Sequence, residues 1–245
     1  VQQFGLVFTA GVVNGSDETL YWIGEDGVDW NDPQNWSNSL GGSSANKVPG
    51  NGTRVVFEGA DSGTMDVNFA DDAEAFSVNF FGNEQVRFDL NGNNILVSNG
   101  FRVSNAVTEI ENGNILFSGD GSIESLVELG NASFTDVDLR FQSGIWKIIS
   151  AGELDNVIIE IATLDIDIVD RIRMGDLSIG SGGNLTGQVN HIEFSGNVNV
   201  ASGASMDDNI TIEFIGESGL VNNQASTDFD LLIASSGTLG LNSDG

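Results

Sequence analysis

The six residues 191–196, HIEFSG, recur twenty positions later as residues 211–216, TIEFIG. The same spacing separates NILVS at 94–98 from NILFS at 114–118. Short runs of β-forming residues that recur with a period near twenty, with Gly and Asn between them, are typical of the coils of a β-solenoid. Equivalent strands of successive coils then pair in parallel, about 4.8 Å apart. The repeat therefore predicts an all-β fold, a parallel β-solenoid (β-helix) of about 20 residues per coil.

Alternation within the repeat predicts which side chains face the core. Ile192 and Ile212 would lie in one inward column, one above the other, whereas Glu193 and Glu213 would point outward. Asn and Gly suit the corners between strands, because those positions often need a positive φ. An antiparallel β-sandwich would also show alternation and turns, but it gives no reason for a fixed period to recur in two separate parts of the chain.

The repeat divides the chain into two parts. Residues 53–245 keep the short alternating texture and are predicted to form the solenoid, whereas residues 1–52 form a separate N-terminal module. A weaker match aligns IGSGG at 179–183 with VASGA at 200–204 and with IASSG at 233–237. Residues 70–76 are the one place after Thr53 where the pattern allows a single helical turn.

Composition limits the compartment and the partners. The 245 residues carry 8 basic and 36 acidic side chains, a net charge of −28, with no Cys. A polyanion would be repelled, so nucleic acid is excluded as a partner. No apolar run approaches the ~20 residues of a membrane helix, so no membrane span is expected. An acidic chain with only two Lys and much Asn, Gly and Ser favours an extracellular protein in salty water, with an acidic cytosolic protein as the alternative.

Three of the four Trp residues, Trp22, Trp30 and Trp36, lie within fifteen positions of the N-terminal module. The first coil of a solenoid exposes unpaired backbone groups and the end of an apolar column. Large aromatic rings, which bury ~150–250 Å² each, could cover that end. The three Trp are therefore predicted to form an aromatic N-terminal cap. The alternative is a carbohydrate-binding module that uses the same rings as stacking platforms.

The same segment resembles the opening of large repetitive bacterial surface and secreted proteins. Trp22-Ile23-Gly24, residues 30–37 (WNDPQNWS), Val48-Pro49 and residues 55–57 (VVF) match their pattern W-x-G … W-x-x-P-x-N-W-S … V-P … V-x-F. These proteins include autotransporter-like passengers and the adhesin-like cargo of Bacteroidetes-type secretion systems. The motif covers about forty residues and precedes long β-solenoids in that group. The resemblance implies display at the bacterial cell surface and an adhesive or structural role, and it transfers no catalytic residue.

Two groups of acidic residues are candidate Ca²⁺ ligands, and no other cofactor is expected. Asp26, Asp29 and Asp32 lie in a Gly-containing stretch that could offer several oxygen ligands to one ion. Asp165 and Asp167 would lie on one face of a strand, where their mutual repulsion could be relieved by Ca²⁺ or by solvation.

The sequence favours a non-enzymatic protein. With no Cys and a single His191, nucleophilic catalysis would have to use that histidine, and no G-x-S-x-G elbow accompanies it. Polyuronate cleavage needs cations facing an acidic substrate, which a chain at −28 would repel. A glycan-degrading β-helix enzyme with paired carboxylates remains an alternative, although no pair stands out among so many acids.

The two ends of the chain suggest self-association. The uncharged segment 4–13 includes Phe4, Leu6 and Phe8, which alternate as in a strand, and no charge occurs in the first sixteen residues. The final repeat is followed by no capping element that the sequence reveals, which would leave a sheet edge open to a continuing chain or to another subunit. The N-terminal segment is therefore predicted to pair with the edge of a neighbouring copy, which builds a head-to-tail filament. Extracellular glycans are the other candidate partner.

Overall fold

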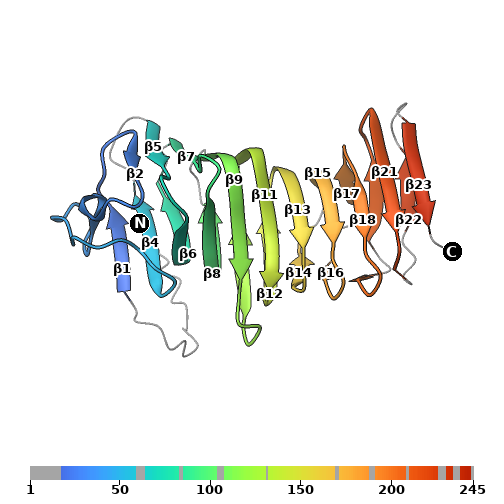
Figure 1. The fold of residues 1–245 in the computed structure, drawn as a ribbon, viewed down its shortest axis with the longest axis horizontal. Coiled ribbons are helices and arrows are strands. Elements are labelled where there is room, and N and C mark those ends of the chain that lie inside the picture. Colours follow the sequence, from blue (N-terminus) through green and yellow to red (C-terminus); the bar gives the residue numbers. More distant parts are fainter. Residues whose placement is uncertain are drawn as a thin grey trace, which may run out of the picture.

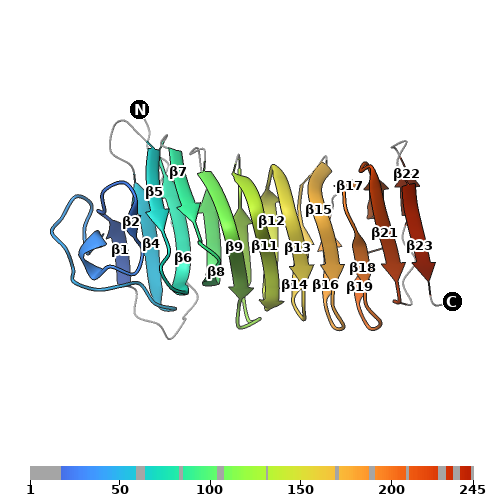
Figure 2. The same ribbon diagram turned by 45° about the horizontal axis from the view of Figure 1, so that its top comes forward.

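The computed structural model describes residues 18–58, 64–82, 85–103, 108–130, 132–168, 171–187, 191–207, 210–225, 230–233 and 238–243. In these ranges the chain forms 23 strands and one short 3-10 helix, Pro33–Asn35. The strands wind into an elongated stack, with the N-terminal module at one end and the last strands at the other (Figure 1, Figure 2). Successive turns contain about 21 residues. The predicted parallel β-solenoid is therefore confirmed, and the antiparallel sandwich is wrong.

Parallel pairing between successive turns traces three ladders, which define three faces of the stack. Face I consists of β2 (Val28–Asp29), β5 (Thr64–Asn68), β7 (Gln85–Asp89), the first parts of β9 (Thr108–Ser118), β11 (Ser133–Ser143), β13 (Glu153–Ile159) and β15 (Arg171–Ile179), and then β17 (His191–Phe194), β20 (Thr211–Phe214) and β22 (Asp230–Ile233). Face II consists of the first parts of β6 (Ala73–Phe81) and β8 (Asn94–Val103), the second parts of β9, β11, β13 and β15, and then β18 (Val198–Val200), β21 (Ser218–Asn223) and β23 (Thr238–Ser243). Face III consists of β1 (Glu18–Trp22), β4 (Thr53–Glu58), the second parts of β6 and β8, and then β10 (Glu124–Glu128), β12 (Ile145–Ser150), β14 (Thr163–Ile166), β16 (Asn184–Gly187) and β19 (Ser205–Met206).

The core is a set of apolar columns that run along the stack. Ile192 is in register with Ile212, and Phe194 with Phe214, and all four side chains are buried. The predicted twenty-residue repeat therefore places identical side chains in contact in successive turns. In the described residues, face II carries the longest such column, whose members are Ala73, Ile95, Ile115, Leu139, Val157, Leu177, Val198 and Val221. Burial of each such side chain contributes roughly 1.5–3 kcal/mol, so the columns provide the main stabilising force.

Two local predictions from the sequence are wrong. Residues 70–76 do not form a helical turn, because β6 begins at Ala73, which pairs with Ile95 and is buried as a small inward residue of face II. The alignment of residues 233–237 with residues 179–183 also fails. Ile233 is in register with Phe214 on face I, whereas residues 179–183 begin on face II, where Ile179 pairs with Val200.

The corners use left-handed backbone, as the Asn and Gly content predicts. Asn91 and Gly92 adopt φ values of 52° and 83° in the turn between faces I and II. Gly144, at the turn that leads into β12, has a φ of 94°, and a Cβ there would lie 2.9 Å from Cα of Gly119 in the preceding turn. At this corner the backbones of two coils therefore approach too closely for any side chain.

The substitution Gly144→Ala tests that corner. It should lower the free energy of unfolding by about 1–3 kcal/mol, because alanine at this φ is strained and its methyl group meets the neighbouring backbone. Urea unfolding followed by circular dichroism measures the change. Gly50→Ala is the matched control, because a Cβ at Gly50 meets no atom within 4 Å. Equal midpoints for the two variants would show that the coils do not meet at Gly144.

Candidate functional sites: the cap, the ion pairs and the open end

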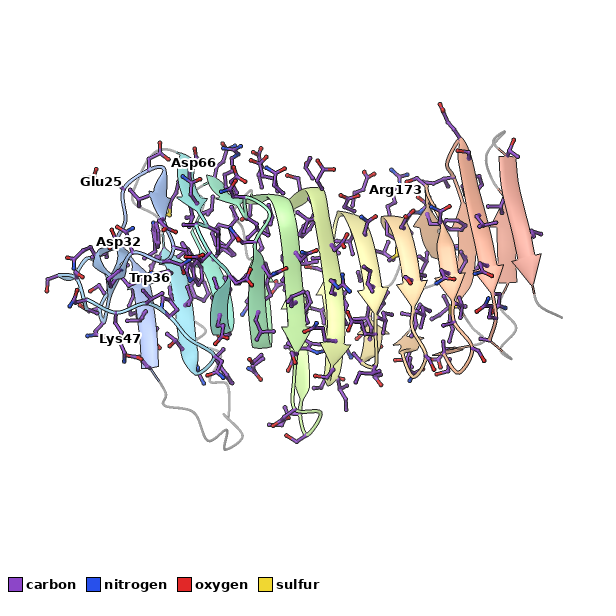
Figure 3. All side chains as sticks on the ribbon, viewed as in Figure 1. Glu25, Asp32, Trp36, Lys47, Asp66 and Arg173 are labelled. Carbon is purple, nitrogen blue, oxygen red and sulfur yellow. The ribbon has the colours of Figure 1, made fainter. Side chains whose placement is uncertain are left out.

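The three Trp of the N-terminal module form a buried aromatic cluster. Trp22, Trp30 and Trp36 are each at most 4% exposed. The ring of Trp36 meets the rings of Trp22 and Trp30 edge-on, with centroids 4.9 and 4.8 Å apart, and its Nε1–H donates to the carbonyl of Trp30 at 2.7 Å. Figure 3 shows Trp36 among the packed side chains at this end of the stack. The predicted aromatic cap is confirmed.

Backbone pairing fixes the cap to the first turns of the solenoid. β1 pairs in parallel with β4 and antiparallel with β3 (Trp36–Ser37), and the amide of Trp30 donates to the carbonyl of Asn68 at 2.8 Å. Phe69 stacks on Trp30 with centroids 5.2 Å apart. The rings therefore face the solenoid core, and in this structure they present no face on which a sugar could stack.

The first candidate Ca²⁺ group, Asp26, Asp29 and Asp32, is spread over separate backbone contacts. Each carboxylate accepts hydrogen bonds from main-chain amides: Asp26 from Asp66 at 2.9 Å, Asp29 from Asn31 at 3.0 Å and Ala70 at 3.2 Å, and Asp32 from Gln34 at 2.9 Å. Asp32 thereby caps the helix Pro33–Asn35. These hydrogen bonds hold the loop from Asp26 to Gln34, here called the cap loop, in place. In the ranges that the structure describes, no three acidic or histidine side chains lie close enough together to hold a metal ion.

The second candidate group is brought together, but around a lysine. The carboxylates of Asp165 and Asp167 lie 3.5 and 3.0 Å from Nζ of Lys147. Lys147 belongs to β12, in register with Asp165 of β14 in the following turn. The hydrogen bond to Asp167 is the main cause of the raised pKa of Lys147, so the ammonium group stays charged. The cation that relieves the repulsion between these two carboxylates is therefore an internal one, which the sequence reasoning missed.

The same principle extends along the solenoid, where basic side chains join different turns. Within the described ranges, seven basic side chains form ion pairs with acids at least eighteen positions away: Lys47 with Glu18, Arg87 with Glu111, Arg102 with Glu128, Arg140 with Glu160, Lys147 with Asp165, and Arg171 and Arg173 with Glu193. The guanidinium group of Arg54 lies 5.9 Å from the ring centroid of Phe76. Exposed pairs contribute only about 0–1 kcal/mol each, so their main effect is to favour one register between neighbouring turns.

Glu193 differs from the other acids that the structure describes, because it points outward and is nevertheless only 2% exposed. Its two carboxylate oxygens accept from Arg171 and Arg173 of the preceding turn, whose side chains cover it. The hydrogen bond from Arg173 is the largest cause of the lowered pKa of Glu193 and outweighs the effect of burial, which alone would raise that pKa. The sequence predicted the outward direction of Glu193 but not its burial.

This arrangement makes a specific part of the stability pH-dependent. Because the pKa of Glu193 is lowered in the folded protein, the stabilisation is complete above the pKa of an unfolded glutamate, about 4.3, and is lost as the pH falls through the lower folded pKa. The difference in free energy of unfolding between the unaltered protein and Glu193→Gln should therefore be largest at neutral pH and shrink towards pH 3. Thermal unfolding of both proteins across this range measures it. A constant difference would show that the carboxylate is not held by the two arginines.

A column of Asp and Asn side chains runs along the outside of face II. It occupies the position just before the inward residues from Ala73 to Val198 of the long apolar column, and its members are Asp72, Asn94, Asn114, Asp138, Asn156, Asp176 and Asn197. Amide nitrogens donate along it, from Asn94 to Asp72 at 2.9 Å, from Asn114 to Asn94 at 2.8 Å and from Asn156 to Asp138 at 2.9 Å. No two Asp are neighbours in this polar column, so like charges are never placed directly opposite one another.

The C-terminal end of the described stack differs from the capped end. Leu241 of β23 is in register with the buried Val221, at the last described position of the long apolar column, and is 67% exposed. Leu220 of β21 is also exposed. In the described residues, the apolar column therefore reaches its last turn with an exposed leucine. The predicted assembly residues Phe4, Leu6 and Phe8 lie outside the described residues, so their contacts are not located.

No match was found in comparisons of the chain with protein-family models, with curated proteins and with solved structures. Among the residues that the structure describes, no helix has the length and apolar character needed to cross a membrane.

Proposed function

We propose that this chain is a non-enzymatic structural segment of an extracellular adhesin or filament, in which one solenoid end is closed and the other receives a further coil. The resemblance of the Trp-rich module to bacterial surface proteins and the acidic, Lys-poor composition support the extracellular part of this proposal. A second copy of the chain is the proposed source of the added coil.

The observation that carries the proposal is the difference between the two ends. At the N-terminal end, Trp30 and Trp36 are buried and seal the core. At the other end, Leu241 follows the buried Val221 in the same apolar column and is 67% exposed. An apolar column that ends in solvent gains free energy from further burial, about 25 cal/mol for each Å² covered. Stacking of another coil there supplies that burial and also pairs the backbone groups of the last strands.

The substitution Leu241→Glu tests whether a second copy stacks on this end. We expect the unaltered protein to sediment faster as its concentration rises from micromolar to millimolar, and Leu241→Glu to remain monomeric, because a charge would be buried without a partner. Sedimentation velocity measures both. Ile161→Glu is the matched control, because Ile161 is as exposed as Leu241, at 66%, and lies between β13 and β14, away from both ends of the stack.

The outcomes separate the parts of the proposal. If Leu241→Glu and Ile161→Glu behave alike, the open end is not the contact. A monomer at all concentrations would contradict self-association. Leu6→Asp, tested in the full chain, asks whether the uncharged N-terminal segment is the part of the second copy that adds to the edge: unchanged assembly would remove that segment from the proposal. Electron microscopy of the same samples, with and without a chelator, tests whether filaments form and whether they require Ca²⁺.

A further inference from the structure

Two arginines of face I stand out by their exposure among the arginines that form ion pairs between turns. Arg171 and Arg173 both lie on β15, and their side chains are 60% and 53% exposed, compared with 37% for each of Arg87, Arg102 and Arg140. They are two positions apart in one strand, so they point to the same side of the sheet. Figure 3 shows Arg173 at the outer edge of the stack.

The two guanidinium groups are held in place by one carboxylate, that of Glu193. Glu193, in register with Arg173 on the adjacent β17, binds Nη1 of Arg171 through one carboxylate oxygen and Nε of Arg173 through the other. Because Glu193 is itself buried, it fixes the positions of both guanidinium groups and leaves their solvent-facing sides uncovered. A fixed pair of donors loses little conformational entropy when it binds a ligand.

The bonds with Glu193 use only part of the donor capacity. A guanidinium group has five N–H donors on three nitrogens, and Glu193 binds one nitrogen of each arginine. With more than half of each side chain exposed, further N–H groups of both arginines face solvent. Two parallel N–H donors match the two oxygens of a carboxylate or of one face of a sulfate, which is the strongest geometry for such pairs.

The surroundings limit how much charge such a ligand can carry. Glu153 is in register with Arg173 on one side, and Glu213 is in register with Glu193 on the other. Together with the net charge of −28, these carboxylates repel a polyanion. Because charges beyond about 8–10 Å are screened at physiological salt, a ligand with a single anionic group interacts mainly with the two arginines and these neighbouring carboxylates, of which Glu193 is already bonded to both arginines.

We propose that Arg171 and Arg173 form a binding site for one oxyanion group, a carboxylate or a sulfate, carried by an otherwise uncharged molecule such as a sparsely acidic sugar. His191, in register with Arg171, borders the site. This proposal is independent of the open end and of self-association, because it rests on exposed side chains of face I in the interior of the stack.

Nuclear magnetic resonance of the arginine Nε–Hε groups in the full chain tests the site. Sodium glucuronate, glucose and sodium sulfate are titrated separately at constant ionic strength, which is set with chloride. Glucuronate, sulfate or both should shift the signals of Arg171 and Arg173 saturably in the millimolar range, and glucose should not. The saturating anion identifies whether the site accepts carboxylate or sulfate. Arg140→Gln, which removes another inter-coil arginine, should leave the saturation unchanged.

Two variants decide between a binding site and a purely structural ion pair. Glu193→Gln removes the internal competitor for both guanidinium groups, so affinity for the anion should rise at least severalfold. The triple variant Arg171→Gln/Arg173→Gln/Glu193→Gln leaves no buried charge, should keep the circular dichroism of the fold, and should lose binding. Absence of saturable shifts in both the unaltered protein and Glu193→Gln would overturn the proposal, as would equal binding by the triple variant.

Discussion

Replacement of Trp36 with alanine should lower the free energy of unfolding by about 3–5 kcal/mol, the range for a large aromatic side chain removed from a packed core. Trp36 has no exposed surface, and its ring packs edge-on against both Trp22 and Trp30. The substitution also removes the hydrogen bond from its indole N–H to the carbonyl of Trp30. The cavity would lie where the cap meets the first turns, so we expect the N-terminal end of the stack to unfold first.

Urea unfolding, followed by circular dichroism and by the fluorescence of the remaining Trp residues, measures this effect. Leu40→Ala serves as the control, because Leu40 lies in the same module but is exposed, and its removal should change stability by less than about 0.5 kcal/mol. If Trp36→Ala were as stable as the control, the ring would not be part of the core. In that case the interpretation of the Trp residues as a sugar-stacking surface would regain support.

Replacement of Phe141 with alanine should have an effect of similar size, about 3–5 kcal/mol, in the middle of the stack. The rings of Phe141 and Phe117 are nearly parallel, with centroids 4.6 Å apart and planes at 12°, and both are fully buried. In a repeat fold, stability is close to the sum of individual turns and the contacts between neighbours. A cavity at Phe141 weakens the contacts of its turn with both adjacent turns, so it should separate the stack into two less cooperative parts.

Hydrogen exchange measures where this loss of stability occurs. Amides of β9, β11 and β13 should lose protection in Phe141→Ala, while those of the N-terminal cap should keep it. Phe81→Ala is the matched control, because Phe81 is a partly exposed outward residue at the end of β6. A uniform loss of protection along the whole chain would contradict the nearest-neighbour description.

The architecture could be predicted because residues that contact each other in successive turns of a solenoid lie at a fixed spacing in the sequence. Asn94 pairs with Asn114, and His191 pairs with Thr211, as the repeat indicates. The period alone does not say which face a match belongs to, so the alignment of Ile233 placed it on the wrong ladder. At Ala73 the inward residue is so small that the alternation is weak, and the sequence pattern also allows a helical turn there.

The polar sites were harder to predict because their partners are one turn apart in the chain. The sequence shows Asp165 as half of an acidic pair, but Lys147 lies eighteen positions earlier and contacts it only because the chain winds once between them. A cation about twenty positions before an acid is the sequence signal for such a pair, and Lys147, Arg140 and Arg173 all carry it. The cap loop carries no such signal, because Asp26, Asp29 and Asp32 accept hydrogen bonds from backbone amides. Nearly every residue has a backbone amide, so the sequence does not show which one a carboxylate will bind.

The polar column of face II limits how such a rod could lengthen during evolution. Duplication of the turn that begins at Asn114 would place one amide above another, between Asn94 and Asp138, and would add about 5 Å of length without a new charge conflict. Duplication of the turn that begins at Asp138 would instead set two carboxylates directly opposite each other, an arrangement that destabilises a sheet. Tandem duplications that persist in descendants of this gene should therefore be found at amide junctions.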